Sequence, residues 1–327
     1  MKKMTFLTIL ISTALLLLAQ PIMAADEKPL KVRIGADSAS FSYQFRVALA
    51  AGIFEKYGID AEISTFSYGI DTVNAAILGE TDTAEAMDFA AASRFSESNK
   101  LKVVSLITIS NPDGAHLYTR NADIKTPKDL EGKRVGVQKA TADEYRWGRL
   151  FEKHDIDTGK VEQIYLGSNA ELLAAYLVEE IDAYWVAPDT EAAVLEIPES
   201  RSLGNNEISG YLMRGFFLVD DDFIKNNREG IVKLLKALDE ASAFINEKPD
   251  ETAVIANKDL KVPVDAAKKN IYAHTYIIRL LQEDVDTIRD VANWAVDNGL
   301  IKNRYDVNNV LYPDAVKEAF PDRVDIK

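Results

Sequence analysis

The 327-residue sequence contains no cysteine and three histidines, and its acidic residues outnumber its basic ones. The absence of cysteine excludes disulfides, thiol catalysis and cysteine-ligated metals, and it also excludes a lipid anchor on an N-terminal cysteine. The histidines (His116, His154 and His274) show no paired metal-ligand spacing. The net charge of −14 argues against nucleic acid and anionic lipid as partners.

Catalytic signatures are also lacking: there is no nucleophile-elbow motif, phosphate loop or Ser-His-Asp order. We therefore expect neither an enzyme nor a cofactor or metal.

Long apolar runs are scarce, and the one that stands out covers residues 5–19 near the N-terminus. Lys2 and Lys3 precede it, and a short segment ending in Ala24 follows. The run is shorter than the roughly 20 residues that a membrane span needs. This layout predicts a cleavable secretory signal over residues 1–24, with cleavage after Ala24 or, alternatively, after Ala25. We expect a periplasmic, unlipidated protein.

The chain contains an internal sequence repeat. The sequence FEKYGID at residues 54–60 returns as FEKHDID at 151–157, and AAILGETD at 75–82 is matched by AYLVEEID at 175–182. Two matched segments in the same order indicate a duplicated unit.

Each copy of the unit reads as strand, helix, strand, helix, strand. We expect the first copy to hold strands at 32–36, 61–66 and 83–87 with helices at 44–57 and 71–78. The second should hold strands at 134–138, 162–165 and 183–186 with helices at 142–154 and 170–179. This alternation predicts an α/β fold of parallel-rich sheets flanked by helices.

Two β-rich segments would connect two lobes: residues 103–118, broken by Asn-Pro-Asp-Gly at 111–114, and residues 211–219. From residue 222 onward the pattern is mostly helical, with amphipathic helices expected at 231–245 and 285–298 that pack back on the first lobe. The expected division is residues 25–117 and 217–327 for lobe 1 and 118–216 for lobe 2. Two lobes with two crossings make a hinged clamp with a cleft between them.

A small-molecule ligand should sit at the carboxyl ends of the strands. The loops there are rich in polar and aromatic residues. The candidate ligand-binding residues are Ser38, Phe41, Tyr43, Tyr68, Gly69, Asp88, Thr141, Trp185, Asp189, Tyr211 and Arg214.

The roles of these candidates remain open at this point. The hydroxyl and acidic side chains either cap helices or mark helix N-termini that together hold an anion. Aromatic rings either pack in the core or wall the site for a flat, apolar or cationic ligand. Arg214 could pair with a carboxylate or sulfonate, and Asp88 or Asp189 could receive an amine. Arg146 and Arg149, three residues apart on one helix, either do the same or face solvent.

Several segments resemble one known family. They are ALAAGIFEKYGID at residues 48–60, AAILGETD at 75–82, IKTPKDLEGKRVGV at 124–137, and Ile181-Asp182-Ala183 through Pro188. They are similar to the periplasmic solute-binding proteins of nitrate, aliphatic sulfonate and taurine importers, a group that also includes binders of thiamine-type pyrimidines. The resemblance covers most of the chain after residue 24.

The resemblance implies a two-lobe, type II periplasmic-binding fold that closes on its ligand. It also implies that both lobes are presented to an ABC permease, which would work with a cytoplasmic ATPase, and we expect the chain to be a monomer. The ligand is expected to be sulfonate- or taurine-like, or else aromatic or heterocyclic. Two alternatives are a periplasmic ligand sensor and a pyrimidine-forming enzyme of the same fold. The enzyme is disfavoured because its relatives use a cysteine-rich segment that this sequence lacks.

Overall fold

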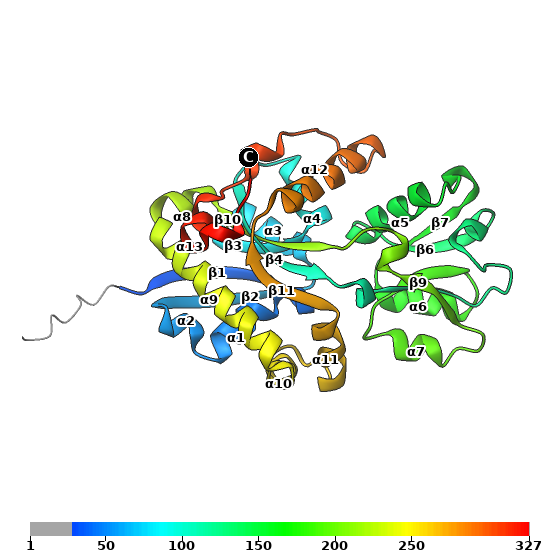
Figure 1. The fold of residues 1–327 in the computed structure, drawn as a ribbon, viewed down its shortest axis with the longest axis horizontal. Helices are drawn as coiled ribbons and strands as arrows, with labels where there is room; N and C mark the ends of the chain where they lie inside the picture. Colours follow the sequence, from blue (N-terminus) through cyan, green and yellow to red (C-terminus); the bar gives the residue numbers. More distant parts are fainter. Residues whose placement is uncertain (1–27, 327) are drawn as a thin grey trace, which may run out of the picture.

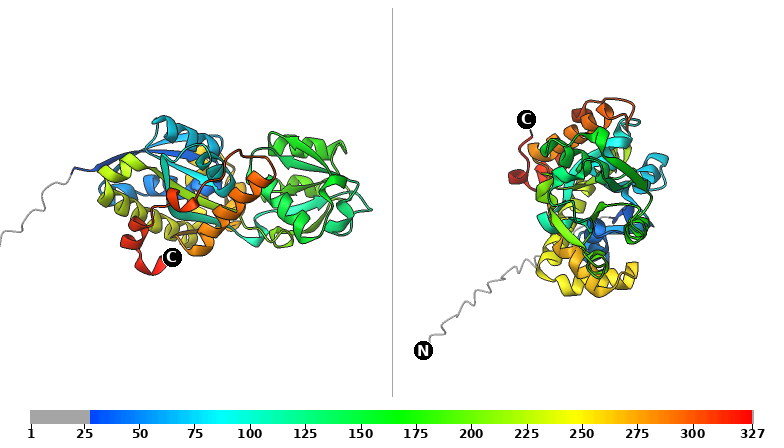
Figure 2. Two further views of the ribbon diagram at one scale, coloured as in Figure 1. Left: turned by 90° about the horizontal axis from the view of Figure 1, so that it is seen from above. Right: turned by 90° about the vertical axis from the view of Figure 1, so that its right-hand side faces the viewer.

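The computed structural model describes residues 28–326. The expected signal peptide and its cleavage site therefore lie outside the described residues. The described chain forms two lobes that lie next to each other along the long axis of the molecule (Figure 1). Each lobe has its own β-sheet with helices on both sides of it, and the lobes remain distinct from above (Figure 2). Among residues 28–326, no helix combines the length and apolarity that crossing a membrane requires.

The first lobe contains a six-stranded sheet in the order β11-β4-β10-β3-β1-β2. Strands β1, β2 and β3 run parallel, and β10 lies antiparallel between β3 and β4. Strand β1 is largely buried because helices cover both faces of this part of the sheet. The strands of this sheet are β1 (Leu30–Asp37), β2 (Ile59–Phe66), β3 (Thr83–Met87), β4 (Leu101–Ser110), β10 (Arg214–Asp220) and β11 (His274–Arg279).

The second lobe contains a five-stranded sheet in the order β7-β6-β8-β5-β9. Strand β6 pairs parallel with β7 and β8, and β5 lies antiparallel between β8 and β9. The strands of this sheet are β5 (His116–Thr119), β6 (Arg134–Gln138), β7 (Glu162–Leu166), β8 (Ala183–Val186) and β9 (Arg201–Asn205).

The two sheets repeat one plan. In each, three parallel strands are followed by an antiparallel strand, β10 or β5, that arrives directly from the other lobe. The same ion pair also recurs, with Arg33 bound to Asp82 in the first lobe and Arg134 bound to Asp182 in the second. In both pairs the carboxylate also accepts the backbone N–H of its arginine. The predicted α/β fold with two lobes and two crossings is confirmed.

The helices follow the expected alternation, with differences that have local causes. One helix was expected over 44–57, but two form because Gly52 adopts a left-handed φ of 70° between them. A helix also begins directly at Asp88, where a loop was expected. Strand β11 lies in the segment expected to be helical and pairs with the edge of β4.

Most helices belong to the first lobe, including those at the C-terminal end of the chain (Figure 1). They are α1 (Tyr43–Ala50), α2 (Ile53–Lys56), α3 (Gly69–Leu78), α4 (Asp88–Phe95), α8 (Asp221–Asn226), α9 (Arg228–Glu247), α10 (Pro249–Leu260), α11 (Val264–Tyr272), α12 (Gln282–Asp297) and α13 (Asp314–Ala319). The second lobe carries α5 (Ala142–Lys153), α6 (Asn169–Leu177) and α7 (Glu191–Leu195).

Two chain segments connect the lobes: residues 111–115 lead from β4 to β5, and residues 206–213 lead from β9 back to β10. The segments are tied to each other, because the side-chain amide of Asn206 donates to the Asn111 carbonyl at 3.1 Å. Nearby, the Asn205 amide donates to the Asp113 carboxylate at 2.8 Å. Paired crossings of this kind let two lobes rotate as rigid bodies about a shared axis.

Candidate functional site: the interlobe cleft

The cleft between the lobes holds about 470 Å³ and is lined by residues of both sheets' carboxyl ends. This volume is in the range of sites for small organic ligands. In the first lobe, the lining follows the ends of β1 and β2 and includes the start of α3. In the second lobe, it follows β6 and β8 and includes the first turn of α5. The cleft therefore lies at the carboxyl ends of the strands, where the sequence predicted the ligand site.

Most of the predicted site residues line this cleft. They are Ser38, Phe41, Tyr43, Tyr68, Gly69, Thr141, Trp185 and Asp189. Both lobes contribute to this group. The cleft therefore brings together side chains from the first and the second copy of the duplicated unit.

Asp88, Tyr211 and Arg214 are placed elsewhere, beside the return crossing. The Tyr211 hydroxyl donates to the Asp88 carboxylate at 2.6 Å, and the backbone N–H of Arg214 donates to the same carboxylate at 3.1 Å. Burial raises the pKa of Asp88 to about 6, although these hydrogen bonds lower it. Arg214 in turn binds Asp284 through Nε at 3.1 Å. These groups satisfy one another and fix the crossing to the first lobe.

Arg146 is the cationic side chain that the sequence left undecided. It lies buried on the wall of the cleft, with its guanidinium 5.2 Å from the centre of the Trp185 ring. Asp143 lies 3.6 Å from one of its nitrogens. The sequence did indicate that Arg146 faces inward, because spacings of four residues put it on the same helix face as Ala142 and the core residue Leu150.

Arg149 lies on a different face of α5. Its guanidinium binds Glu152 one turn away, and both side chains are substantially exposed. The solvent-facing interpretation therefore applies to Arg149 and not to Arg146.

Three buried donors of the cleft lack a partner within residues 28–326: the hydroxyl of Tyr43, the Nε of Arg146 and the indole Nε1 of Trp185. Burial raises the pKa of Tyr43 to about 12, so its hydroxyl stays protonated at neutral pH. Tyr43 belongs to the first lobe and Trp185 to the second. The cleft thus has unpartnered buried donors on both sides, from the first lobe and from the second.

The helix N-termini at the cleft differ in how far they are occupied. At α5, Thr141 accepts the N–H of Asp143 at 3.2 Å, and Glu144 accepts the N–H of Ala140. The capping role therefore fits Thr141. At α3, no side chain caps the first turn, which begins at Gly69 on the cleft wall. Of these two termini, only that of α3 has no side-chain cap, although the Asp71 N–H already donates to the Tyr68 carbonyl at 3.0 Å.

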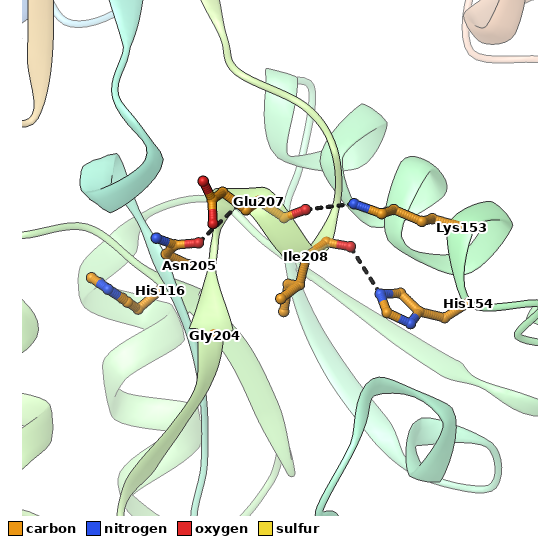
Figure 3. Close-up of a pocket in the computed structure, with 7 residues that line it drawn as sticks. All are labelled: His116, Lys153, His154, Gly204, Asn205, Glu207 and Ile208. Carbon is orange, nitrogen blue, oxygen red and sulfur yellow. Dashed lines mark hydrogen bonds between the residues drawn. The ribbon is translucent and has the colours of Figure 1, made fainter.

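A second hollow lies on the second lobe, between the end of α5 and the segment after β9 (Figure 3). The Lys153 ammonium donates to the Glu207 carbonyl at 2.6 Å, and a ring nitrogen of His154 lies 2.8 Å from the Ile208 carbonyl. His116 lies on the other side of this segment, against Glu191. Because these polar groups bind one another, we place the ligand site in the cleft. Within residues 28–326, no cluster of three or more His, Cys, Asp or Glu side chains is arranged to hold a metal ion.

Comparisons with known proteins point in one direction. The family described as NMT1/THI5 like matches residues 42–252, more than half of the chain. A protein of Brucella abortus (strain 2308) that is named as a binding protein is 26% identical over 269 residues, which cover 80% of each chain.

Solved structures share the fold. The periplasmic aliphatic sulphonate binding protein SsuA from Escherichia coli superposes with a TM-score of 0.78 at 19% identity, covering 87% of this chain and 92% of that one. The alkanesulfonate-binding protein SsuA from Xanthomonas axonopodis pv. citri, solved with MOPS bound, gives 0.72 at 18% identity, with coverages of 88% and 99%. The two-lobe periplasmic-binding fold that the sequence resemblance implied is thereby confirmed.

Proposed function

Because the chain belongs to the NMT1/THI5-like family, we propose that it is the periplasmic substrate-binding component of an ABC importer. It captures a small organic molecule in the interlobe cleft and delivers it to a membrane permease that is driven by a cytoplasmic ATPase. The ligand is sulfonate- or taurine-like, or else aromatic or heterocyclic. The lobes predicted from the sequence, residues 25–117 with 217–327 and residues 118–216, have boundaries that fall two or three residues inside β5 and β10, just after the crossings at residues 111–115 and 206–213.

The observation that carries the proposal is the pair of unused donors on opposite walls of the cleft, Tyr43 and Trp185. A buried donor without a partner costs about 1–3 kcal/mol, and buried polar groups are almost always paired. A ligand with acceptor oxygens would satisfy both donors at once. The guanidinium of Arg146, whose Nε is also unpartnered, lies on the same wall as Trp185.

The rest of the lining supports a ligand with an apolar body. Ile70, Met87 and Met213 contribute apolar side chains, and Leu172 and Trp185 do so from the second lobe. Methionine adapts to ligands of different shape, and an aromatic ring favours a flat partner. A bare inorganic anion would leave this apolar surface uncovered.

Capture would proceed by closure about the two crossings. Open and closed forms of such clamps differ by a few kcal/mol, so contacts made only in the closed form decide which one dominates. A ligand that accepts from Tyr43 on one lobe and Trp185 on the other makes contacts of that kind. Closure would bury the ligand and present both lobes together to the permease.

The proposal is tested by a thermal-shift screen of residues 25–327 after partial unfolding and refolding to remove any carried-over ligand. The panel holds taurine, alkyl and aryl sulfonates, nitrate, aromatic carboxylates, pyrimidines and quaternary amines. A ligand at 100 times its Kd adds roughly 2.7 kcal/mol to the free energy of unfolding. If no compound shifts the melting temperature and no small molecule co-purifies, the proposal fails.

A further inference from the structure

The charges that line the cleft do not suit a simple anion. The second lobe contributes Lys139, Asp143, Arg146 and Asp189. The Arg146 charge is offset by Asp143 at 3.6 Å, and Lys139 lies near Glu144, whose pKa is raised by burial and only partly lowered by that lysine. Basic charge in the cleft is therefore already matched by acidic charge, and Asp189 adds a further carboxylate.

The first lobe adds acidic charge of its own. Among its described lining residues, Asp37 alone carries a carboxylate, and no lysine or arginine joins it there. Asp37 is the last residue of β1 and is nearly buried, with 6% of its surface exposed. One carboxylate oxygen accepts the N–H of Ala39 at 2.9 Å.

A second carboxyl group lies directly behind Asp37. Glu85, in the middle of β3, is fully buried, and its Oε1 accepts the backbone N–H of Asp37 at 3.3 Å. The other oxygen, Oε2, has no partner within residues 28–326. Burial, followed by the proximity of Asp37, raises the pKa of Glu85 well above its ordinary value. Two carboxyl groups this close cannot both ionise without a neighbouring cation.

The nearest protein cation does not fill this role completely. Arg46, on α1, directs one nitrogen to the Asp37 backbone carbonyl at 2.9 Å rather than to its carboxylate. Another nitrogen binds the Asp259 carboxylate at 2.6 Å, so the Arg46 charge is shared: it lowers the pKa of Asp37 and Glu85 in part, but burial still raises both. His274 also lines the cleft, but burial lowers its pKa to about 4 and keeps it neutral at pH 7.

We infer that Asp37, supported by Glu85, is a subsite for a cationic nitrogen, so that the ligand of this cleft is a small organic molecule with a basic nitrogen. The inference rests on the proposed function and narrows its ligand class. The nitrogen would bind at the first lobe, and the acceptor group would bind Tyr43 and Trp185. The aromatic rings of Phe41 and Tyr68 line the same part of the cleft and favour a cation through their faces.

Matched ligand pairs test the inference on the unaltered protein. Taurine is compared with ethanesulfonate, 4-(aminomethyl)benzoate with 4-methylbenzoate, and imidazole-4-acetate with phenylacetate, each by calorimetry. We expect the nitrogen-bearing member of at least one pair to bind at least tenfold more tightly. The first two pairs report an aliphatic ammonium, and the third reports a protonated heterocycle. Equal or tighter binding of the nitrogen-free member in every pair that binds overturns the inference and leaves the proposed function standing.

Variants locate the subsite. Asp37→Asn should reduce the preference for the nitrogen-bearing member to less than threefold, whereas Glu80→Gln, an exposed change of equal charge in the same lobe, should leave it intact. A preference unchanged in a folded Asp37→Asn protein overturns the assignment to Asp37. If that variant does not fold, Glu85→Gln is measured in the same way, and an unchanged preference there overturns the pairing of the two acids.

The molecule that co-purifies decides the case in which no panel member binds. Mass spectrometry of the extracted ligand supports the inference if the compound contains a basic nitrogen and overturns it if it does not. An empty protein that binds nothing counts against the proposed function itself, and the inference falls with it.

Discussion

At the scale of single residues, Tyr43 and Trp185 combine burial with unused donors. Trp185 also packs in the second-lobe core, with its ring 6.0 Å from that of Trp147, so truncation to alanine would confound binding with folding. Tyr43→Phe keeps the ring and removes only the donor, and Trp185→Phe removes the donor while keeping a smaller aromatic ring in the core.

We expect Tyr43→Phe and Trp185→Phe each to weaken ligand binding by about 1 kcal/mol, the usual contribution of one hydrogen bond. Without ligand, Tyr43→Phe should leave stability unchanged or slightly higher, because it removes a buried donor that has no partner in the protein. Calorimetry with the best ligand and chemical denaturation of the ligand-free protein measure the two quantities. Full retention of affinity in both variants would remove these donors from the site.

Two buried groups should make stability depend on pH in opposite directions. The pKa of Asp88 is raised by burial from its ordinary value of 3.8 to about 6, so its contribution to stability is lost as pH rises from 4 to 6. The pKa of His274 is lowered by burial from 6.5 to about 4, so its contribution is lost as pH falls over nearly the same range. A pKa about two units from its unfolded value corresponds to roughly 3 kcal/mol, so the two effects largely cancel.

Single variants should therefore expose the opposing slopes. Between pH 4 and 6, Asp88→Asn is expected to make the free energy of unfolding rise more steeply with pH than in the unaltered protein. His274→Gln is expected to make it rise less steeply or fall. Denaturant titrations at half-unit pH steps compare the three curves, and parallel curves would show that neither group titrates as the structure indicates.

At the scale of elements, α5 of the second lobe meets α12 of the first beside the return crossing. Gly148 of α5 is the point of contact: a Cβ placed there would lie 2.2 Å from the Trp294 ring. Tyr145 adds edge-to-face contacts with Trp294 and with Tyr211, at ring distances of 5.3 and 4.8 Å. These rings connect the lobes outside the ligand cleft, so their packing should influence how far the cleft opens.

Enlarging Gly148 should disturb this contact specifically. We expect Gly148→Val to lower the free energy of unfolding by about 1–3 kcal/mol through overpacking and to change ligand affinity by altering the lobe angle. In the double variant Gly148→Val with Trp294→Ala, the smaller side chain at position 294 makes room for the valine. This variant should therefore recover part of the lost free energy of unfolding and part of the change in ligand affinity.

The control for this experiment is Gly159→Ala in the second lobe, where the added Cβ would meet only a side-chain oxygen of Asp157 at 3.3 Å. Additive losses in the double variant, with no recovery, would show that the two residues do not act through their mutual contact.

At the scale of the whole molecule, the two crossings and the cleft predict closure without association. We expect light scattering to give the mass of one chain with and without ligand. Small-angle scattering should give a smaller radius of gyration when ligand is bound. A doubled mass, or an unchanged radius at saturating ligand, would contradict a monomeric clamp that closes on its cargo.

The sequence by itself determined the repeated strand–helix order and the two crossings. Those features depend on local causes, namely hydrophobic periodicity, turn residues and spacing. These patterns do not depend on tertiary contacts, so the sequence alone is enough to recognise them. Even the boundaries of β3, β6 and β8 agree with expectation. The split at Gly52 depends on a single left-handed residue, and the strand at β11 depends on pairing with β4 far earlier in the chain.

Only the tertiary structure decided which of the candidate side chains line the cleft. Asp88 and Tyr211 are 123 residues apart in sequence, and their hydrogen bond withdraws both into the base of the return crossing. Arg146 lies on the cleft wall because its guanidinium packs against the Trp185 ring and lies near Asp143, and the subsite that we propose at Asp37 depends on Glu85 of the adjacent strand β3. Burial and charge pairing depend on such distant partners, so a strand-end pattern can locate the cleft but cannot choose the residues that act in it.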